Sequence, residues 1–398
     1  MVKNFIPVTE AKELIKNNCT PLQAVEIPLR KALNTVLASD VYSPVNIPGF
    51  AQSAMDGYAI AYDELKNTSS FIISGESFAG ITGQLKLNEG EAIRIFTGAP
   101  VPLQADTVIM QEHVSVSNGQ ISITDPSNII KGQHVRPAGS EIMQGSLAMS
   151  KGELLTAPAI GFLAGLGTTT VPVFPFPSVT IITTGKEIIQ PGNELAFGQV
   201  YGSNSASLSA ALQQLHLHKI DCTTVDDNIT LLEKSIENAV LNSDIVLITG
   251  GVSVGDYDLV PGALKNIGLE IIFHKVQQRP GKPLLFGRKN NKLVFGLPGN
   301  PSSVLSCFYN YVVPAIQYKM NRPIPFLPTM QMKMKEAFSK KIPLTQFLKG
   351  YYKDNEVMWL GAQESFRLSS FAVSNCLIEI PAEKNMIEKD EWVTVHLI

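Results

Sequence analysis

The residues of this chain best suited to chemistry follow a short apolar run near its middle. The run 245–248 (IVLI) leads into Gly250 and Gly251, and Asp256 and Asp258 come soon after. The glycines allow a tight turn with exposed backbone N–H groups, which suits an anionic ligand. Two carboxylates beside a polyanion usually bind a bridging divalent cation. The pattern predicts a binding loop, although it is also compatible with a plain turn whose aspartates cap the next helix.

Polar side chains also follow the other strands predicted in this region. In an open parallel sheet, ligands bind outside the carboxyl ends of the strands. These ends carry Thr184, Gly185 and Glu187; Asp226 and Asp227; Ser253 beside the acidic pair; Lys275, Arg279 and Lys282; and Pro298, Asn300, Pro301 and Ser303. Taken singly, Asp227 could cap a helix, Lys282 could be a solvated lysine, and 298–301 could be a rigid turn. Together they offer carboxylates for a cation beside basic groups and a helix N-terminus for oxyanions.

The elements that must position these residues lie between about 178 and 320. The run 245–248 does not alternate, as is typical of a strand covered on both faces. Right-handed crossovers would place the loops after parallel strands at one edge, so the segment predicts a doubly wound α/β domain. Strands are expected at 178–184, 219–225, 244–249 and 269–276, with a strand pair near Leu284 and Phe295; helices are expected from Ser203, after Asn228, over 259–266 and after Pro301.

The segments on either side have other periodicities. Residues 1–45 predict helices, with Thr9 as an N-cap and a second apolar stripe at Leu29, Leu33, Val36 and Leu37. Short alternating runs and the hairpin signal Asn118-Gly119 predict a small inserted β domain, after which helical character returns at 154–167. The alternation of Met330, Met332 and Met334 predicts a C-terminal barrel or sandwich. The expected domains are 1–45 with 141–176, 46–140, 177–326 and 327–398.

The bulk composition excludes several functional classes. A net charge of -3 without a basic run gives no electrostatic footprint for nucleic acid or a membrane surface. No run approaches the length of a membrane span, and the N-terminus lacks the features of a signal peptide. Neither GxGxxG nor a Walker A loop is present, which disfavours dehydrogenases and P-loop kinases. Reduced thiols in a cytoplasmic protein are expected from the widely spaced Cys19, Cys222, Cys307 and Cys376.

No nucleophile with a neighbouring base stands out in the sequence, so catalysis is expected to come from binding, charge neutralisation and metal positioning.

Seven motifs in order resemble one family: SAMDGYA (53–59), RIFTGAPVP (94–102), DTVIMQE (106–112), TTGKE (183–187), TGGVSVGDYD (249–258), RPGKP (279–283) and GLPGNPSS (296–303). With SSFAVSNCLIEIP (369–381), they resemble molybdopterin molybdenumtransferase, the MoeA family, also seen as the E domain of gephyrin. The resemblance runs nearly end to end.

The resemblance implies an elongated four-domain homodimer in the cytoplasm. Its parts would be an N-terminal helical domain, an inserted β domain, a MogA-like molybdopterin-binding α/β domain and a C-terminal β-barrel. It also implies that adenylylated molybdopterin is hydrolysed with molybdate and Mg²⁺, so that AMP leaves as molybdenum enters the dithiolene. A molybdopterin adenylyltransferase would act upstream and molybdoenzymes would receive the product.

The resemblance also implies roles for individual residues. Asp56 and Thr97 would complete the active site of the partner subunit. The remaining catalytic positions would be Glu187, Asp227, Asp258, Lys275 and Arg279, and the metal would be held by Glu187, Asp256 and Asp258. Ligand-binding positions would be Thr184, Gly185, Gly250, Gly251, Ser253, Lys282, Pro298, Asn300, Pro301, Ser303 and Ser369 or its neighbour Ser370.

Three residues depart from the pattern common in the family. Glu141 stands where aspartate is usual, Arg279 where some relatives carry lysine, and Lys349 where arginine is common. We expect Arg279 to keep the charge while changing the hydrogen-bond geometry. The changes at Glu141 and Lys349 are expected to alter affinity for the metal or anion without removing activity.

Two other functions fit part of the sequence. The α/β domain resembles that of molybdopterin adenylyltransferases, but three further domains argue against that activity. A non-catalytic, gephyrin-like scaffold could bind a partner peptide, but it would not need the charged residues at the strand ends.

Overall fold

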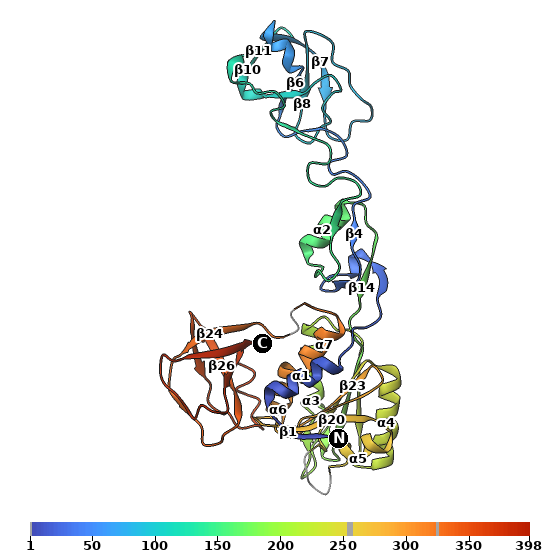
Figure 1. Ribbon diagram of the computed structural model, residues 1–398, viewed down its shortest axis with the longest axis vertical. Helices are drawn as coiled ribbons and strands as arrows, with labels where there is room; N and C mark the ends of the chain where they lie inside the picture. The colour runs from blue at the N-terminus through green and yellow to red at the C-terminus, as the bar shows by residue number, and fades with distance from the viewer. Residues whose placement is uncertain (1, 253–257, 324–325) are drawn as a thin grey trace.

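The chain is elongated and has four units, three of which follow one another along the long axis while the fourth lies beside the last of them (Figure 1). The computed structural model describes residues 2–252, 258–323 and 326–398. A small β unit lies at one end, a narrow middle unit follows, and an α/β unit lies beside a β-barrel at the other end. The predicted multidomain fold with an α/β domain, an inserted β domain and a C-terminal barrel is confirmed.

The α/β unit is built on a seven-stranded sheet in which β22 is the one antiparallel strand among those described. All four predicted single strands and the predicted strand pair are present. In spatial order the strands are β1 (Lys3–Ile6), β20 (Glu270–Val276), β22 (Leu285–Lys289), β23 (Lys292–Leu297), β19 (Ile245–Thr249), β15 (Val179–Thr184) and β18 (Ile220–Val225).

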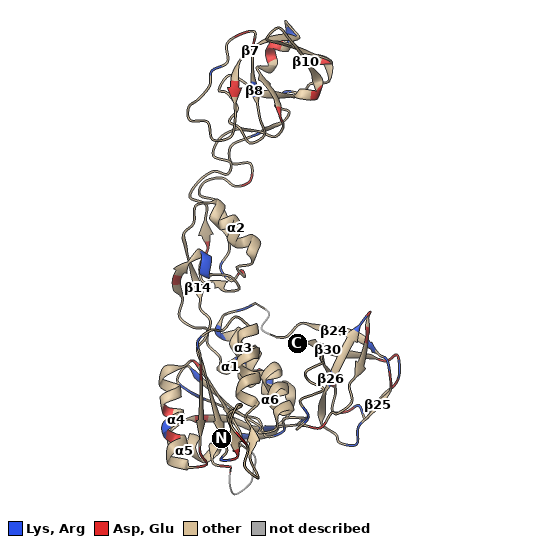
Figure 2. Cartoon of the chain, turned by 180° about the vertical axis from the view of Figure 1, so that it is seen from behind, with Lys and Arg blue, Asp and Glu red and all other residues tan. Residues whose placement is uncertain are grey.

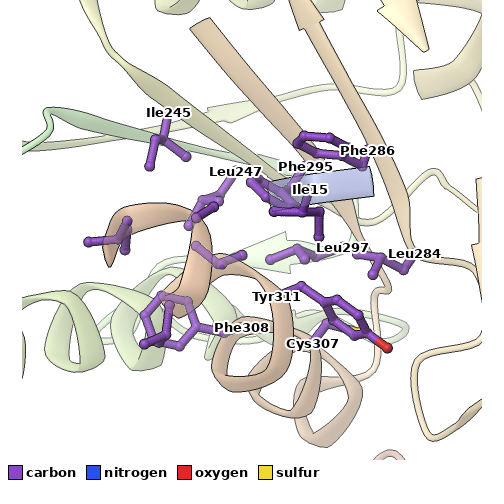
Figure 3. Close-up of a cluster of buried hydrophobic side chains, with 14 of the residues drawn as sticks. Ile15, Ile245, Leu247, Leu284, Phe286, Phe295, Leu297, Cys307, Phe308 and Tyr311 are labelled. Carbon is purple, nitrogen blue, oxygen red and sulfur yellow. The ribbon is translucent and has the colours of Figure 1, made fainter. Parts of the chain in front are cut away.

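Helices cover both faces of this sheet, so its central strands are buried throughout. On β19, Ile245 and Leu247 face one core, and Val246 and Ile248 face the other, which explains why the run does not alternate. Figure 3 shows part of the first core, to which Phe286, Phe295 and Tyr311 all belong. That face carries α1 (Val8–Asn18), α3 (Asn204–Gln214) and the continuous helix formed by α6 (Pro301–Cys307), the π-helical η5 (Phe308–Val312) and α7 (Val313–Lys319); the other carries α4 (Ile229–Asn242) and α5 (Val260–Asn266).

Two helices of the first face, α3 and α6, differ in charge from α4 on the other face. In Figure 2, α3 and α6 are uncharged, whereas α4 carries acidic and basic residues on its solvent side. A helix that packs between a sheet and other elements has little solvent-exposed surface on which to place charges. The charge pattern therefore marks α6 as an internal element, and its N-terminus lies at the strand ends that the sequence predicts to hold a site.

Residues 3–18 belong to the α/β unit, which differs from the expectation that 1–45 form part of a helical domain. β1 pairs in parallel with β20 at the edge of the sheet, and α1 buries Val8, Ala11 and Ile15 in the first core. The apolar stripe of α1 covers sheet surface that would otherwise be exposed. The prediction of Thr9 as N-cap is wrong, because the helix begins at Val8 after Pro7 and has no side-chain cap.

The middle unit is assembled from segments on both sides of the insertion. Its strands are short and pair across that gap in sequence, and Thr156 caps its helix by accepting from the Ala159 N–H. Its core joins Leu29 and Leu37 to Leu163 and Val171. The elements are β2 (Val25–Pro28), β3 (Val36–Leu37) and β14 (Thr170–Phe174) in one sheet, β4 (Val41–Tyr42) with β13 (Leu147–Met149), and α2 (Ala157–Gly165).

The second helix predicted within 1–45 is wrong. Leu29 begins a single 3₁₀ turn, η1 (Leu29–Lys31), Leu33 is exposed, and Val36 and Leu37 form β3. Asn34 has φ of 62°, which ends any helix there. Pairing of both β2 and β3 with β14 satisfies their backbone groups, so tertiary pairing overrides the helical spacing.

The inserted unit is a six-stranded sheet. The predicted hairpin is present: Asn118 and Gly119 both have positive φ and join two of its strands. In spatial order the strands are β10 (Val114–Ser117), β11 (Gln120–Ile123), β7 (Ser70–Ser77), β8 (Glu91–Ile95), β6 (Gly57–Ile60) and β9 (Thr107–Met110); η2 (Tyr62–Lys66), η3 (Gln111–His113), η4 (Pro126–Asn128) and the pair β5 (Gln52–Ser53) and β12 (Val135–Arg136) complete the unit.

The C-terminal unit is a closed barrel, because β26 pairs with both β27 and β28. Met332 and Met334 lie in its core as the alternation predicts, but Met330 is 44% exposed. The strands are β26 (Thr345–Lys353), β27 (Glu356–Trp359), β24 (Thr329–Met334), β30 (Trp392–Leu397) and β28 (Cys376–Ile380), with β25 (Phe338–Ser339) and β29 (Met386–Ile387) as a separate pair and β21 (Gln278–Arg279) joining from the α/β unit.

Candidate active site

A cavity of about 590 Å³ lies at the carboxyl ends of β15, β19 and β23. Ten residues predicted for the site line it: Thr184, Gly185, Glu187, Asp227, Gly250, Gly251, Asp258, Pro298, Asn300 and Pro301. Its wall also includes eight residues that the sequence reasoning did not select: Thr183, Ile188, Val200, Asn204, Thr249, Val252, Pro283 and Gly299. Ile188 and Val200 belong to the small strands β16 (Ile188–Ile189) and β17 (Val200–Tyr201). The strand ends therefore converge on one cavity.

Glycines at two strand ends bring the backbone of the cavity wall close together. Gly250 has φ of 88° and Gly185 has φ of 136°, a region that suits glycine. A Cβ atom on Gly250 would lie 2.8 Å from the Thr184 hydroxyl, and one on Gly185 would lie 2.8 Å from both Glu187 carboxylate oxygens. Glycine is therefore needed at both turns, and the Glu187 carboxylate folds back over Gly185.

Three buried oxygens of the cavity wall have no hydrogen-bond partner among the described residues: Thr183 Oγ1, Thr249 Oγ1 and Asn204 Oδ1. Thr183 and Thr249 are register partners on β15 and β19 and are at most 4% exposed. Asn204, at the start of α3, donates from Nδ2 to the Gly299 carbonyl at 2.9 Å. Buried polar atoms are normally satisfied, so these oxygens are suited to a ligand or to ordered water. Because Asn204 begins a predicted helix beside these strand ends, the sequence held a signal for it.

The segment 298–301, which follows β23, forms part of the cavity wall. Pro298, Gly299, Asn300 and Pro301 line the cavity, and Asn300 Nδ2 donates to the Ser365 hydroxyl at 2.8 Å. The Ser302 N–H, in the first turn of α6, donates to the Ser365 carbonyl at 3.0 Å. One donor of the predicted oxyanion-binding helix terminus is therefore already used within the chain.

Comparisons with known proteins decide the family of this chain. Its sequence matches the MoeA N-terminal region (domain I and II) over residues 6–167, a probable molybdopterin binding domain over 180–318, and the MoeA C-terminal region (domain IV) over 331–398. It is 34% identical to the molybdopterin molybdenumtransferase of Haemophilus influenzae, with 94% of each chain covered. This chain belongs to the MoeA family.

Further MoeA relatives agree in length and shape. A molybdopterin molybdenumtransferase of Staphylococcus aureus is 31% identical, with 99% of this chain and 96% of the relative covered. The crystal structure of a molybdopterin biosynthesis MoeA protein from Pyrococcus horikoshii is 32% identical, covers 99% of both chains and has a TM-score of 0.84. The resemblance drawn from the seven motifs is confirmed.

The basic residues predicted for this MoeA site do not line the cavity. Arg279 and Lys282 are exposed, and Lys275 is half-buried with φ of 71°. The Lys282 ammonium lies 5.0 Å from the centre of the Phe5 ring, and Pro283 next to it does reach the cavity. The three cations are thus near the wall by chain position, and their contact with an anion stays a prediction.

Asp56 and Thr97 are brought together in the inserted unit, as the family resemblance implies. The Thr97 N–H and hydroxyl both donate to Asp56 Oδ1, at 2.7 and 2.8 Å. These two hydrogen bonds lower the pKa of the Asp56 carboxyl below its usual value. The pair lies at the opposite end of the elongated chain from the cavity (Figure 1). Within one chain it cannot contribute to that site.

Three other predicted positions lie away from the cavity wall, and two more lie outside the described residues. Ser303 is buried on α6, Ser369 is exposed in the loop after β27, and neither lines the cavity. Ser370 donates to the Ala362 carbonyl at 2.8 Å within that loop. Ser253 and Asp256 lie outside the described residues.

The two departures outside the α/β unit also lie away from the cavity wall. Glu141 is exposed, and its N–H donates to the Ile47 carbonyl at 3.0 Å. Lys349 is buried and donates to the Ala362, Arg367 and Glu364 carbonyls at 2.7, 3.0 and 3.4 Å. The prediction that Lys349 tunes anion affinity therefore finds no direct contact that would carry it.

The carboxylates of the cavity suit a magnesium ion that shares its ligands with a substrate. Among the described residues no group of three or more His, Cys, Asp or Glu side chains could hold a metal alone. Mg²⁺ usually takes one or two carboxylates together with substrate phosphates and water, so Glu187, Asp227 and Asp258, which all line the cavity, are ligands of a suitable type. Over the described part of the chain, no helix is long and apolar enough to cross a membrane.

Proposed function

We propose that this protein is a molybdenum insertase of molybdenum cofactor biosynthesis. It would use molybdate and adenylylated molybdopterin, form the molybdenum cofactor and release AMP. The observation that carries the proposal is the cavity at the strand ends, which three carboxylates, the glycine turns and residues 298–301 line together in a member of the MoeA family. The relatives named molybdopterin molybdenumtransferase support the reaction class.

The proposal gives the residues of the cavity two tasks, the binding of the polyanion with its metal and the binding of the pterin. The backbone at Gly250 and Gly251 allows close approach of the ligand, since neither glycine presents a side chain. Glu187 and Asp258 would hold Mg²⁺ together with Asp256, and the ion would neutralise phosphate charge and favour departure of AMP. The unpartnered oxygens of Thr183, Thr249 and Asn204 would accept N–H groups of the pterin.

The protein is proposed to act as a homodimer in which each inserted unit completes the site of the other chain. The support is the distance between Asp56 and the cavity within one chain, together with the exposed carboxylate that Thr97 orients. Asp56→Ala and Asp258→Asn should each inactivate the enzyme. Re-forming dimers from an equal mixture should restore about one quarter of wild-type activity, because half the dimers are mixed and each has one intact site. No recovery would exclude the shared site.

The reaction itself is tested with purified protein, adenylylated molybdopterin, molybdate and Mg²⁺. We expect molybdate-dependent release of AMP and reconstitution of a molybdenum-requiring apo-enzyme by the product. Asp258→Asn should abolish both while the oligomeric state is kept. AMP incorporation from ATP would instead indicate an adenylyltransferase, and the absence of both reactions would leave a scaffold. A molybdopterin adenylyltransferase would supply the substrate, and molybdoenzymes would receive the product.

The four free cysteines support a reducing compartment such as the cytoplasm as the place where the protein acts.

A further inference from the structure

Ser365 joins the C-terminal barrel to the wall of the cavity. It lies in the loop between β27 and β28, and it accepts the Asn300 side-chain amide on its hydroxyl and the Ser302 N–H on its carbonyl. Asn300 lines the cavity, and the Ser302 N–H belongs to the first turn of α6, where donors have no partner within the helix. One residue of the barrel therefore satisfies both a side chain and a helix terminus of the site.

The loop that carries Ser365 is held on both sides by one buried ammonium group. Lys349 donates to the Ala362 carbonyl before Ser365 and to the Arg367 carbonyl after it. Gln363 adds two bonds, from its Nε2 to the Lys349 and Leu360 carbonyls, at 2.8 and 2.7 Å. Hydrogen bonds to a charged donor are among the stronger ones in proteins. Ser365 is thus presented to the α/β unit from a fixed loop.

The cavity wall is also fixed from its other side. Asn204 of α3 donates to the Gly299 carbonyl, one residue before Asn300. The segment 298–302 is therefore hydrogen-bonded to α3 at Gly299 and to the barrel at Asn300 and Ser302. The bond between Asn300 and Ser365 fixes the rotamer of a cavity-lining side chain from the barrel, as the bond from Asn204 to Gly299 does from within the α/β unit.

We propose that Ser365 is a positioning residue for the ligand of this cavity. By holding the Asn300 amide, it fixes the polar face that the 298–301 wall presents to the pterin nucleotide. The identity of that ligand rests on the proposed function, whereas the role of Ser365 concerns the wall alone. The barrel thereby contributes to binding through Ser365 without touching the ligand.

The test uses the full-length protein and the variant Ser365→Ala. We expect KM and the equilibrium Kd for adenylylated molybdopterin to rise about threefold to tenfold, the range for loss of one hydrogen bond. The value of kcat should stay within about twofold, because the interaction acts equally on bound substrate and transition state. Ser365→Thr keeps the hydroxyl and should restore wild-type binding. Ser374→Ala removes a hydroxyl of the same loop that donates to the Phe371 carbonyl, and it should change neither constant.

A double-mutant cycle with Asn300→Ala separates positioning from a general structural effect. If Ser365 acts through Asn300, Ser365→Ala should have no further effect on Kd in the Asn300→Ala background. Equal Kd values for wild type and Ser365→Ala would overturn the proposal, as would fully additive effects in the cycle. The outcome remains distinct from that of the proposed function: binding decides the role of Ser365 even if the wild type binds the nucleotide without inserting molybdenum.

Discussion

Replacement of Lys349 should destabilise the barrel, because the Lys349 ammonium group donates hydrogen bonds to several carbonyls of the loop after β27. The side chain is 3% exposed and reaches two carbonyls at 2.7 and 3.0 Å, with a third at 3.4 Å. Hydrogen bonds to charged groups contribute about 1.5–3 kcal/mol each, so the two short bonds give about 3–6 kcal/mol before burial is considered. Burial opposes the charged form and lowers the pKa of Lys349. We expect Lys349→Met to cost about 3 kcal/mol.

The assay can observe the barrel alone. The chain has two tryptophans, Trp359 on β27 and Trp392 on β30, and both lie in the barrel. Urea unfolding followed by tryptophan fluorescence therefore reports this unit. A loss of 3 kcal/mol lowers the midpoint by about 1–3 M urea, given the usual slopes for small domains. Lys349→Arg keeps the donors and should lose less.

Lys353→Met is the matched control, because Lys353 lies at the exposed end of the same strand. It should unfold at the wild-type midpoint. If Lys349→Met also unfolds there, the three carbonyl contacts do not stabilise the barrel and the account of its buried ammonium is refuted.

Three further outcomes are expected. Burial raises the pKa of Glu379, but the hydrogen bond from His396 and the charge of Lys12 outweigh this effect, so the pKa in the folded protein lies below the usual 4.5. The stability of the barrel should therefore fall as the pH drops below about 4.5. In urea titrations at several pH values, Glu379→Gln should make this pH dependence weaker. In thiol titration of the native protein Cys222 should react first, because Cys19, Cys307 and Cys376 have pKa values raised by burial to about 12; equal rates for all four would contradict this. Gly250→Ala should lower the free energy of unfolding by about 1–3 kcal/mol, because Gly250 has a positive φ and a Cβ there would contact Thr184, and it should also weaken ligand binding. Gly262→Ala on α5 is the control, because a Cβ there meets open space, and it should change neither property. The urea midpoint and the Kd of the ligand measure the two effects.

Local sequence signals predicted most elements of the α/β unit and a hairpin of the inserted unit, because periods, caps and turn residues are local. The apolar run 245–248 is a buried strand, Asn228 caps α4 by accepting from the Leu231 N–H, and Asn118-Gly119 turns a hairpin. The helix expected from Leu29 to Leu37 is not formed, because the same spacing of apolar residues is also compatible with a turn followed by a short strand. Only the pairing of β2 and β3 with β14 decides between those alternatives.

Sequence by itself determined the family and the residue types of the site, since glycines, carboxylates and prolines at strand ends are required by backbone geometry and ligand charge. It could also gather the ends of β15, β19 and β23, because parallel topology fixes the edge at which they meet. Tertiary structure alone decided which side chains face the cavity. Asn204 is there because its amide reaches Gly299, and Lys349 is not, because its ammonium turns to three carbonyls of its own barrel. Such choices depend on contacts between residues far apart in sequence, which no local pattern encodes.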